Sequence, residues 1–318
     1  MSGLLAGIDI GGTKCAVSLG QVEGDRINII EKFRFPTPAT PSKTLELLVS
    51  HLQTLLAKQA HLLSAIGISC GGPLDSRKGL ILSPPNLPGW DAVPIVKHFT
   101  EAFSVPVALQ NDANAGALAE WLWGAGQGCQ NMIFLTFGTG MGAGLILNGK
   151  LYSGTNDMAG EVGHIRLADD GPMGYGKMGS FEGFCSGGGI KQLASSYAES
   201  ALEAGKTPDF SPTKDDLASI TAEKVALSSD PLAHEIFETV ALQLGQGLST
   251  LIDILNPERI IIGGIYMRQR ERLEPTLQAI LKQETLSYSL SVCQILPAGL
   301  GELIGDYAAL AVARYQHA

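Results

Sequence analysis

The sequence predicts a protein of two domains, each built from both strands and helices. Its 318 residues are enough for two domains of ordinary size, and 45% of them are hydrophobic, which allows a substantial core. Short apolar runs that end at glycine or proline, typical of buried strands, alternate with segments whose hydrophobic residues recur at helical spacing. One unit, an apolar strand followed by a Gly/Thr turn and a return strand, occurs twice at widely separated positions. This repetition indicates duplicated domains.

The composition argues against several classes of partner. Lys and Arg total 22 against 31 acidic residues, for a net charge of -9, and no segment concentrates the basic residues. A nucleic-acid-binding surface needs clustered cations, so we expect no nucleic-acid partner. The five cysteines are scattered without a CxxC pair, which is typical of reduced, cytoplasmic proteins. The N-terminus lacks a basic leader region and no apolar run reaches membrane-spanning length, so we expect a soluble cytoplasmic protein without a membrane partner.

The first copy of the repeated unit lies at the start of the chain. Residues 4–10 predict a buried strand and residues 15–19 its return strand. Glycines between two strands are usually turn chemistry alone. Here Asp9 interrupts the apolar strand and a Thr-Lys pair follows the glycines, which adds a carboxylate, a hydroxyl and a cation to bare backbone N–H groups. Such groups suit a metal-bound phosphate, although the spacing fits neither a Walker A loop nor a GxGxxG motif. The turn residues are Gly11, Gly12, Thr13 and Lys14.

A strand, a helix and a proline-rich loop are expected next. Residues 27–35 predict a strand that ends at prolines, and Ser42 is a suitable N-cap for a helix whose hydrophobic residues recur over 45–56. Residues 83–90 are too rich in proline for regular structure and predict a stiff surface loop. Such a loop could hold Asn86 at a site, although an Asx turn is the plainer explanation of that residue.

A strand-to-helix junction carries a dense polar cluster. The apolar run 105–109 stops there, and an Ala-rich helical pattern continues to Gly124. Asn or Asp before a helix is most often a cap, favoured by the helix dipole. One polar side chain is enough to cap a helix, whereas this junction holds Asn111, Asp112 and Asn114. On this stretch alone, a cap and an active site remain equally open.

The second copy of the repeated unit spans residues 132–147. If the two hairpins face each other, they could clamp a polyphosphate from both sides, which favours a nucleotide site. Further along, Glu161 and His164 interrupt a segment of glycine and apolar residues, where an explanation as a solvated surface fits poorly. Glu182 lies in the glycine-rich stretch 171–189, which indicates either a flexible loop or close backbone contact with another group. The turn residues of this second copy are Gly138, Thr139 and Gly140.

The C-terminal part of the chain predicts helices around one further strand. Residues 190–254 have helical patterns, and a final helix is expected over 302–315. Between them, the buried strand 259–262 runs directly into Gly263 and Gly264. This step resembles a third close backbone approach, which would suit a nucleoside base or ribose.

Together, these motifs resemble the ROK (repressor, open reading frame, kinase) family of sugar kinases. They occur in the order and approximate spacing of that family, and the match extends over essentially the whole chain. The resemblance implies an α/β protein of two domains with an actin-like, ribonuclease-H-like fold, which binds ATP and a hexose in the cleft between the domains. The motifs are DIGGTK at 9–14, NLPGW at 86–90, NDAN at 111–114, GTGMG at 138–142, GEVGH at 160–164 and Glu182.

The resemblance also implies domain limits and residue roles. We expect an N-terminal domain over 1–115, a C-terminal domain over 116–300, and a C-terminal helix over 301–318 that packs back on the first domain. Asp112 would be the general base for the attacking sugar hydroxyl, and Asp9 would lie near Mg²⁺, through a water molecule. Both glycine hairpins would hold the phosphates of ATP, and Gly263 and Gly264 would lie near the nucleoside. The residues expected to bind sugar hydroxyls are Asn86, Asn111, Glu161, His164 and Glu182.

The chain departs from the family pattern at one site. The family usually binds a structural zinc ion through one His and three Cys, but the three cysteine positions here hold Met173, Tyr175 and Ser180. One imidazole cannot replace a four-ligand site, so we expect no structural zinc, with His164 kept for sugar contact. Cys185 is expected to be a small buried residue. Packing should then hold this loop, with Tyr175, Met178 and Phe181 as candidates.

The expected function is that of an ATP-dependent kinase acting on a sugar hydroxyl, the 6-OH of glucose or a related hexose. A kinase of N-acetylhexosamines or fructose and a non-catalytic sugar-binding regulator remain alternatives. The same family contains repressors with a DNA-binding segment before the first phosphate motif; since only eight residues precede Asp9, we expect none here. Family members are commonly dimers, so a homodimer is expected.

Overall fold

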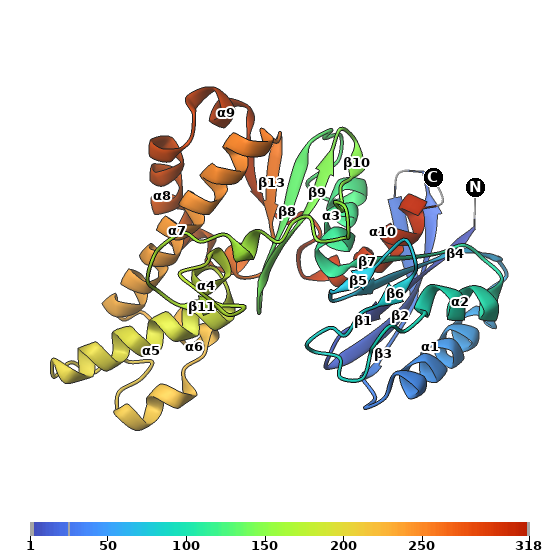
Figure 1. Cartoon of the computed structure of the whole chain (residues 1–318), viewed down its shortest axis with the longest axis horizontal. Helices are drawn as coiled ribbons and strands as arrows, with labels where there is room; N and C mark the ends of the chain where they lie inside the picture. The colour runs from blue at the N-terminus through green and yellow to red at the C-terminus, as the bar shows by residue number, and fades with distance from the viewer. Residues whose placement is uncertain (1–2, 25, 317–318) are drawn as a thin grey trace. The chain divides into compact units, whose positions relative to one another are not determined.

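The structure, a computed structural model, describes residues 3–24 and 26–316 (Figure 1). It divides into two compact units. The first contains the chain up to Phe134, Gly144–Ala159 and the chain from Ala298 on, and the second contains Leu135–Ala143 and Gly160–Pro297.

These units differ from the limits expected after residues 115 and 300, because helix α3 belongs with the first unit. Helix α3 (Asp112–Trp123) packs against α10 (Ile304–Gln316). A side chain at Gly144 would lie 2.3 Å from the carbonyl oxygen of Ala113, so the segment after residue 143 also lies directly against α3.

A five-stranded sheet with strand order β3-β2-β1-β4-β7 forms the centre of the first unit. Strands β1, β2 and β3 are antiparallel neighbours, whereas β1, β4 and β7 are parallel. The register pairs Ile10 with Cys70 and Cys70 with Asn111, so the three parallel strands end at the same edge. The segments after β1 and β7 therefore begin at one edge of this sheet. The strands are β1 (Leu4–Ile10), β2 (Lys14–Glu23), β3 (Arg26–Pro36), β4 (Leu63–Cys70) and β7 (Val107–Asn111).

Helices cover both faces of this sheet (Figure 1). On one face, helices α1 (Pro41–Leu56) and α2 (Ile95–Phe103) bury apolar side chains with those of the strands in a single hydrophobic cluster. On the other face, α10 lies so close to the strands that a side chain at Gly67 would be 2.0 Å from the carbonyl oxygen of Ala309. This unit also contains a two-stranded ribbon of β5 (Leu74–Asp75) and β6 (Leu80–Ile81).

A second five-stranded sheet has the order β10-β9-β8-β13-β14. Its strands are β8 (Met132–Phe137), β9 (Met141–Leu147), β10 (Lys150–Leu151), β13 (Arg259–Ile262) and β14 (Gln294–Pro297). The second unit also contains a ribbon of β11 (Met173–Gly174) and β12 (Lys177–Met178). Its helices are α4 (Phe181–Phe184), α5 (Gly187–Glu203), α6 (Ala222–Leu227), α7 (Pro231–Leu255), α8 (Ile265–Glu284) and α9 (Ser287–Val292), with short 3₁₀ turns at Val162–His164 and Lys214–Ser219.

Strands β1, β2, β3, β7, β8, β9 and β13 and helices α1, α3, α5, α7 and α10 agree with the sequence predictions, although α1 differs at its start, whereas α2, α8 and β14 were not expected. Helix α1 begins earlier than expected, because Thr40 rather than Ser42 is the N-cap and accepts a hydrogen bond from the backbone N–H of Lys43. Helix α8 was not expected at all. Its sequence does carry a helical pattern, since the buried Leu273, Leu277 and Leu281 recur every fourth residue, but Pro275 and the low mean hydropathy made the pattern easy to miss.

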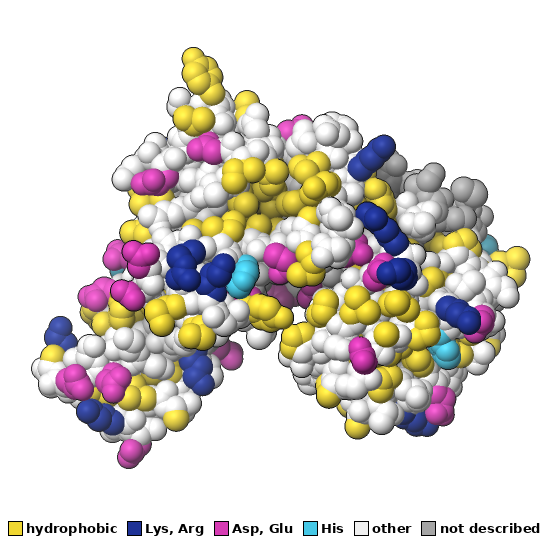
Figure 2. Space-filling view, viewed as in Figure 1, with side chains coloured by type: hydrophobic (Ala, Val, Ile, Leu, Met, Phe, Trp, Pro, Cys, Tyr) yellow, Lys and Arg dark blue, Asp and Glu magenta, His cyan; other side chains and the backbone are white. Residues whose placement is uncertain are grey.

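Basic side chains are dispersed over the surface. On the face shown in Figure 2, Lys and Arg lie singly or in small groups among acidic and apolar side chains, without a continuous basic surface. Over the part of the chain that the structure describes, every helix is too short or too polar to cross a membrane.

Candidate active site

The first glycine hairpin follows β1 at the carboxyl edge of the first sheet. Its turn is closed by a hydrogen bond from the backbone N–H of Gly11 to the carbonyl oxygen of Lys14, at 3.0 Å. Thr37, just beyond β3, donates its hydroxyl to the Gly11 carbonyl at 2.6 Å, and its own backbone N–H bonds to the Thr13 carbonyl at 3.0 Å. Thr37 therefore fixes the shape of this turn. The sequence analysis missed it, because a threonine between two prolines resembles an ordinary loop residue.

The loop that carries Asn86 lies directly against this hairpin. A side chain at Gly12 would come within 2.5 Å of the Asn86 carbonyl oxygen, so only glycine allows the two segments to approach so closely. Leu87 and Trp90 anchor the loop, since both are buried in the core of the first unit. The Asn86 side chain itself is exposed. The structure thus brings Asn86 beside the first hairpin, as expected for residues of one site.

At the junction of β7 and α3, one polar side chain caps the helix and a second one does not. The N-cap is Asn111, whose side-chain oxygen accepts the backbone N–H of Asn114 at 2.7 Å. Asp112 occupies the first helical turn, and its carboxylate accepts a local hydrogen bond from the Ala113 N–H at 2.8 Å. Since Asn111 already caps the helix, a structural role does not require Asp112. Asn114 is fully buried and donates its amide to Gln110 and to Ser153, so it serves the packing of this junction.

Both acidic residues at this edge have raised pKa values. Burial and the neighbouring carboxylate of Asp112 raise the pKa of Asp9 to about 6, against the opposing effect of Lys14. Desolvation also raises the pKa of Asp112, while the hydrogen bond from Ala113 lowers it. Asp112 is nevertheless an exposed residue, so a small molecule can approach it. A carboxyl group with a raised pKa and an accessible oxygen is suited to accept a proton.

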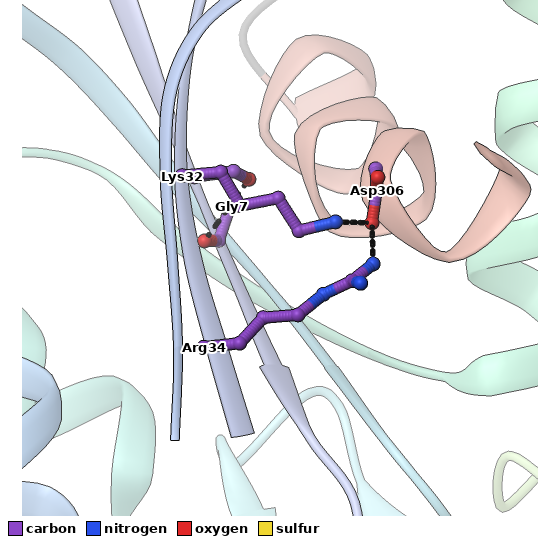
Figure 3. Close-up of polar contacts among 5 residues, drawn as sticks. Gly7, Lys32, Arg34 and Asp306 are labelled. Carbon is purple, nitrogen blue, oxygen red and sulfur yellow. Dashed lines mark hydrogen bonds and ion pairs between the residues drawn. The ribbon is translucent and has the colours of Figure 1, made fainter. Parts of the chain in front are cut away.

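A cluster of charges lies on the same face of the sheet as Asp9. Asp306, in the first turn of α10, pairs with both Lys32 and Arg34 of β3, with a distance of 2.7 Å to the Arg34 guanidinium (Figure 3). In the strand register, Arg34 is opposite Ala16 and Ala16 is opposite Asp9. Asp306 thus holds the two cations at the edge strand, and its charge also contributes to the raised pKa of Asp9.

In the second unit, three glycine segments converge. The hairpin between β8 and β9 is closed by a hydrogen bond from the Gly138 N–H to the Gly140 carbonyl, at 3.1 Å. The first residue of α5, Gly187, donates its N–H to the Gly138 carbonyl at 2.8 Å. A side chain at Gly264 would lie 2.1 Å from the Phe137 carbonyl, so the segment after β13 also reaches this hairpin. The structure therefore brings the second hairpin together with Gly263 and Gly264.

The start of α5 is a functional candidate that the sequence analysis did not single out. Ser186 is its N-cap, and the three residues that follow are glycines. A helix of this length carries a partial positive charge at its N-terminus, where free backbone N–H groups can bind an anion. The sequence does contain Ser-Gly-Gly-Gly before a helical pattern, but the same residues are also typical of a flexible loop.

Three of the five residues expected to bind sugar lie close together in the second unit. The carboxylate oxygen Oε2 of Glu182 accepts the backbone N–H of Met141 at 2.9 Å, which places Glu182 against the second hairpin. Glu161 and His164 flank the short 3₁₀ turn and are both exposed. The ring of His164 meets that of Tyr175 edge to face, with 6.3 Å between ring centroids.

Hydrogen bonds, more than packing, hold the loop that lacks the zinc cysteines. Phe181 is fully buried as expected, but the candidates Tyr175 and Met178 were wrong, since 75% and 44% of their surfaces are exposed. Ser180 caps α4 by accepting the N–H of Gly183 at 3.0 Å, and Arg166 donates to the Met178 carbonyl at 2.7 Å. Cys185 is fully buried and donates its thiol to the Val240 carbonyl, so it is the small buried residue that we expected.

The donor set at Asp9 fits a magnesium ion that is bound mainly by other ligands. Mg²⁺ usually takes one or two protein carboxylates and fills its remaining positions with water and substrate phosphates. Asp9 and Asp112 lie near enough to raise each other's energy as anions, and a divalent cation would relieve that repulsion. Within residues 3–24 and 26–316, no three His, Cys, Asp or Glu side chains are grouped to form a complete metal cage.

Known proteins resemble this chain over nearly its whole length. A model of the ROK family matches residues 5–315. The glucokinase of Streptomyces coelicolor is 32% identical over 267 residues, which cover 82% of each chain. The crystal structure of a ROK family glucokinase from Streptomyces griseus, in complex with glucose and AMPPNP, has a TM-score of 0.74 and 30% identity, and covers 98% of this chain and 99% of that one.

Repressors resemble the chain as well. The xylose repressor of Bacillus subtilis is 24% identical over 305 residues, which cover 95% of this chain and 74% of the repressor. The two α/β sheets and the likeness to the solved sugar kinases show the expected actin-like fold. Fold, motif order and the match over residues 5–315 lead to the same conclusion: the chain belongs to the ROK family, with glucokinases among its relatives.

Proposed function

We propose that this chain is an ATP-dependent hexose kinase that transfers the γ-phosphate to the 6-OH of glucose or a closely related hexose. One observation carries the proposal: Asn111 caps α3, which leaves the accessible Asp112 carboxylate, with its raised pKa, free for chemistry at the edge that holds the first glycine hairpin. The likeness to a glucokinase that binds glucose and AMPPNP supports the choice of substrates.

In this proposal, Asp112 orients the attacking hydroxyl by accepting its hydrogen bond and takes its proton late in the reaction. A sugar hydroxyl is far less acidic than a carboxylic acid, so orientation contributes as much as basicity. Backbone N–H groups of the two hairpins would stabilise charge on the phosphoryl oxygens. Mg²⁺ near Asp9, when bound with ATP, would neutralise part of the same charge. The side chains proposed to bind sugar hydroxyls are Asn86, Asn111, Glu161, His164 and Glu182.

The nucleoside would lie near Gly263, Gly264 and the start of α5, which all reach the second hairpin. This assignment is supported by the hydrogen bond from Gly187 to Gly138 and by the close approach of Gly264 to Phe137. A helix N-terminus beside a glycine hairpin suits the phosphates of the same nucleotide.

A non-catalytic sugar-binding regulator is the second candidate. The likeness to the xylose repressor, which covers 95% of this chain, favours it. A kinase of fructose or of N-acetylhexosamines would use the same polar residues and differ only in pocket shape. We further propose a cytoplasmic homodimer, which the five free thiols and the exposed apolar side chains of α9, Tyr288 and Val292, support. Light scattering of the purified protein tests the dimer.

The deciding experiment measures ADP release with Mg-ATP against a panel of hexoses and N-acetylhexosamines. The parent protein is compared with Asp112→Ala, and with Asp75→Ala as a matched loss of an aspartate on a short ribbon of the same unit. We expect sugar-dependent release from the parent and from Asp75→Ala, and almost none from Asp112→Ala. Unchanged turnover in Asp112→Ala would refute the assignment of the base. If no sugar supports release but sugars raise the thermal stability, the regulator is the better description.

A further inference from the structure

Glu182 joins two parts of the second unit that the proposed function treats separately. It is one of the residues assigned to the sugar, yet its Oε2 accepts the backbone N–H of Met141, at the end of the phosphate hairpin. The neighbouring residue must be glycine for this contact, because a side chain at Gly140 would lie 2.7 Å from the same oxygen. The carboxylate therefore fills the space that a side chain on the hairpin would take.

Both partners of this contact are held firmly. Glu182 lies in the first turn of α4, whose N-cap Ser180 is fully buried. The hairpin is tied at its other end by the hydrogen bond from Gly187 to the Gly138 carbonyl, at 2.8 Å. The hairpin is thus held on one side by the backbone of α5, and on the other by a single hydrogen bond to a side chain, that of Glu182.

The second carboxylate oxygen, Oε1, has no hydrogen-bond partner among the described residues, and the side chain is only half-buried. An ionised carboxylate can accept several hydrogen bonds, so Oε1 stays able to bind a hydroxyl while Oε2 holds the hairpin. We infer that Glu182 is a positioning residue that connects the sugar to the phosphate hairpin: a sugar hydroxyl on Oε1 fixes the carboxylate, and the carboxylate fixes the backbone that receives the γ-phosphate. This inference rests on the proposed function.

Such a link has a thermodynamic consequence. Without a sugar, the Glu182 side chain is held by one hydrogen bond. The hairpin then loses conformational entropy when the nucleotide binds, which weakens nucleotide binding. With a sugar on Oε1, that cost is met beforehand, so the nucleotide binds more tightly. Coupling between two ligands is reciprocal, so the nucleotide must also tighten sugar binding by the same factor. The link would also keep ATP hydrolysis slow when no sugar is present.

The test measures the dissociation constant of Mg-AMPPNP by calorimetry, with and without the sugar that supports turnover, D-glucose first. Four proteins are compared: the parent, Glu182→Ala, Glu182→Gln and Glu161→Ala. Glu182→Ala removes the acceptor for Met141, and loss of a charge-assisted hydrogen bond to a backbone N–H should weaken sugar-free AMPPNP binding roughly tenfold. It should also abolish the effect of sugar on nucleotide affinity. Glu182→Gln keeps an acceptor, so its sugar-free affinity should stay within about threefold of the parent.

Glu161→Ala is the matched control, since it removes another carboxylate assigned to the sugar, whereas the acceptor for the Met141 N–H is Glu182. It should weaken sugar binding and leave sugar-free AMPPNP affinity unchanged. Parent-like AMPPNP affinity in Glu182→Ala, or equal losses in Glu182→Ala and Glu161→Ala, would overturn the inference. Thermal unfolding of each variant shows whether it is folded. If Glu182→Ala does not fold, Glu182→Gln decides. The inference would then be overturned if Glu182→Gln bound AMPPNP tenfold more weakly without sugar, yet sugar still tightened nucleotide binding as in the parent. If the parent shows no sugar-dependent ADP release, the proposed function fails instead.

Discussion

Asp9 should destabilise the protein in the absence of its ligands, and replacing it by asparagine should show by how much. Folding raises the pKa of this carboxyl from 3.8 to about 6, first because it is buried and next because Asp112 lies nearby. An acid whose pKa is higher in the folded state binds its proton more tightly there, so ionisation favours unfolding as the pH rises. Asp9→Asn removes this ionisation while keeping the shape of the side chain.

The magnitude follows from the shift. A difference of about two pKa units corresponds to about 3 kcal/mol of unfolding free energy above pH 7, where Asp9 is fully ionised in both states. At pH 5 the gain should be about half of that, because only the unfolded chain is then largely ionised, and below the ordinary pKa it should vanish. Asp9→Asn should therefore raise the unfolding free energy most at alkaline pH.

Urea unfolding followed by fluorescence at pH 8 and pH 5, without Mg²⁺ or nucleotide, measures the effect. The control is Asp75→Asn, because hydrogen bonds from the Lys78 backbone and side chain lower the pKa of Asp75, so that loss of its charge should not stabilise. A midpoint for Asp9→Asn equal to or below that of the parent at pH 8, or a gain that is the same at both pH values, would refute the reasoning. Addition of Mg-ADP should then raise the midpoint of the parent more than that of the variant.

Three further predictions concern single side chains. If Asp112 is the base, as proposed, its raised pKa means that activity is lost on acidification at a higher pH than an ordinary carboxyl would allow, because a base must be ionised to accept a proton. A pH profile of kcat/KM without such an acid limb would contradict this. Gly12→Ala should raise KM for both ATP and sugar, since its side chain would lie 2.5 Å from the Asn86 carbonyl, whereas Gly305→Ala, an exposed position with open space, should change neither in the same steady-state assay. Glu120 is fully buried and accepts three backbone N–H groups, from Ala125, Gly299 and Leu300, at 2.7, 3.0 and 2.9 Å. Glu120→Ala should cost about 3 kcal/mol or more of unfolding free energy in urea, because those three buried donors lose their acceptor, and a cost below about 1 kcal/mol would contradict this.

Local patterns in the sequence predicted much of the fold, together with the glycine turns and the polar junction of the candidate site. Apolar runs that end at glycine identified β1, β8 and β13, because the residues needed for a buried strand and a tight turn are neighbours in sequence. The junction at Asn111 and Asp112 was equally visible. Which of the two caps α3 was not, because either side chain can reach the free N–H groups of a helix start, and only the backbone path shows that Asn111 does so.

Contacts between distant segments were beyond any local pattern. Helix α8 has leucines at helical spacing, but its packing against α7 could not be predicted from them. The hydrogen bonds from Thr37 to Gly11 and from Gly299 to Glu120 join residues that are far apart in the chain. No periodic pattern in the sequence predicts such pairs. The loop that lacks the family's zinc cysteines gives the clearest case, because aromatic side chains in sequence suggested packing, whereas the folded chain leaves Tyr175 exposed.

The sequence by itself thus determined the order of strands, glycine turns and polar junctions, and with them the family, since each of these depends on residues within a few positions of one another. Only the tertiary structure decided which polar groups are already satisfied and which stay free. The side-chain oxygen of Asn111 is occupied by a helix end and the Oε2 of Glu182 by the Met141 N–H, while Asp112 makes only a local hydrogen bond and stays exposed. Hydrogen bonding and burial depend on groups brought together from far along the chain, and those are fixed only when the chain folds.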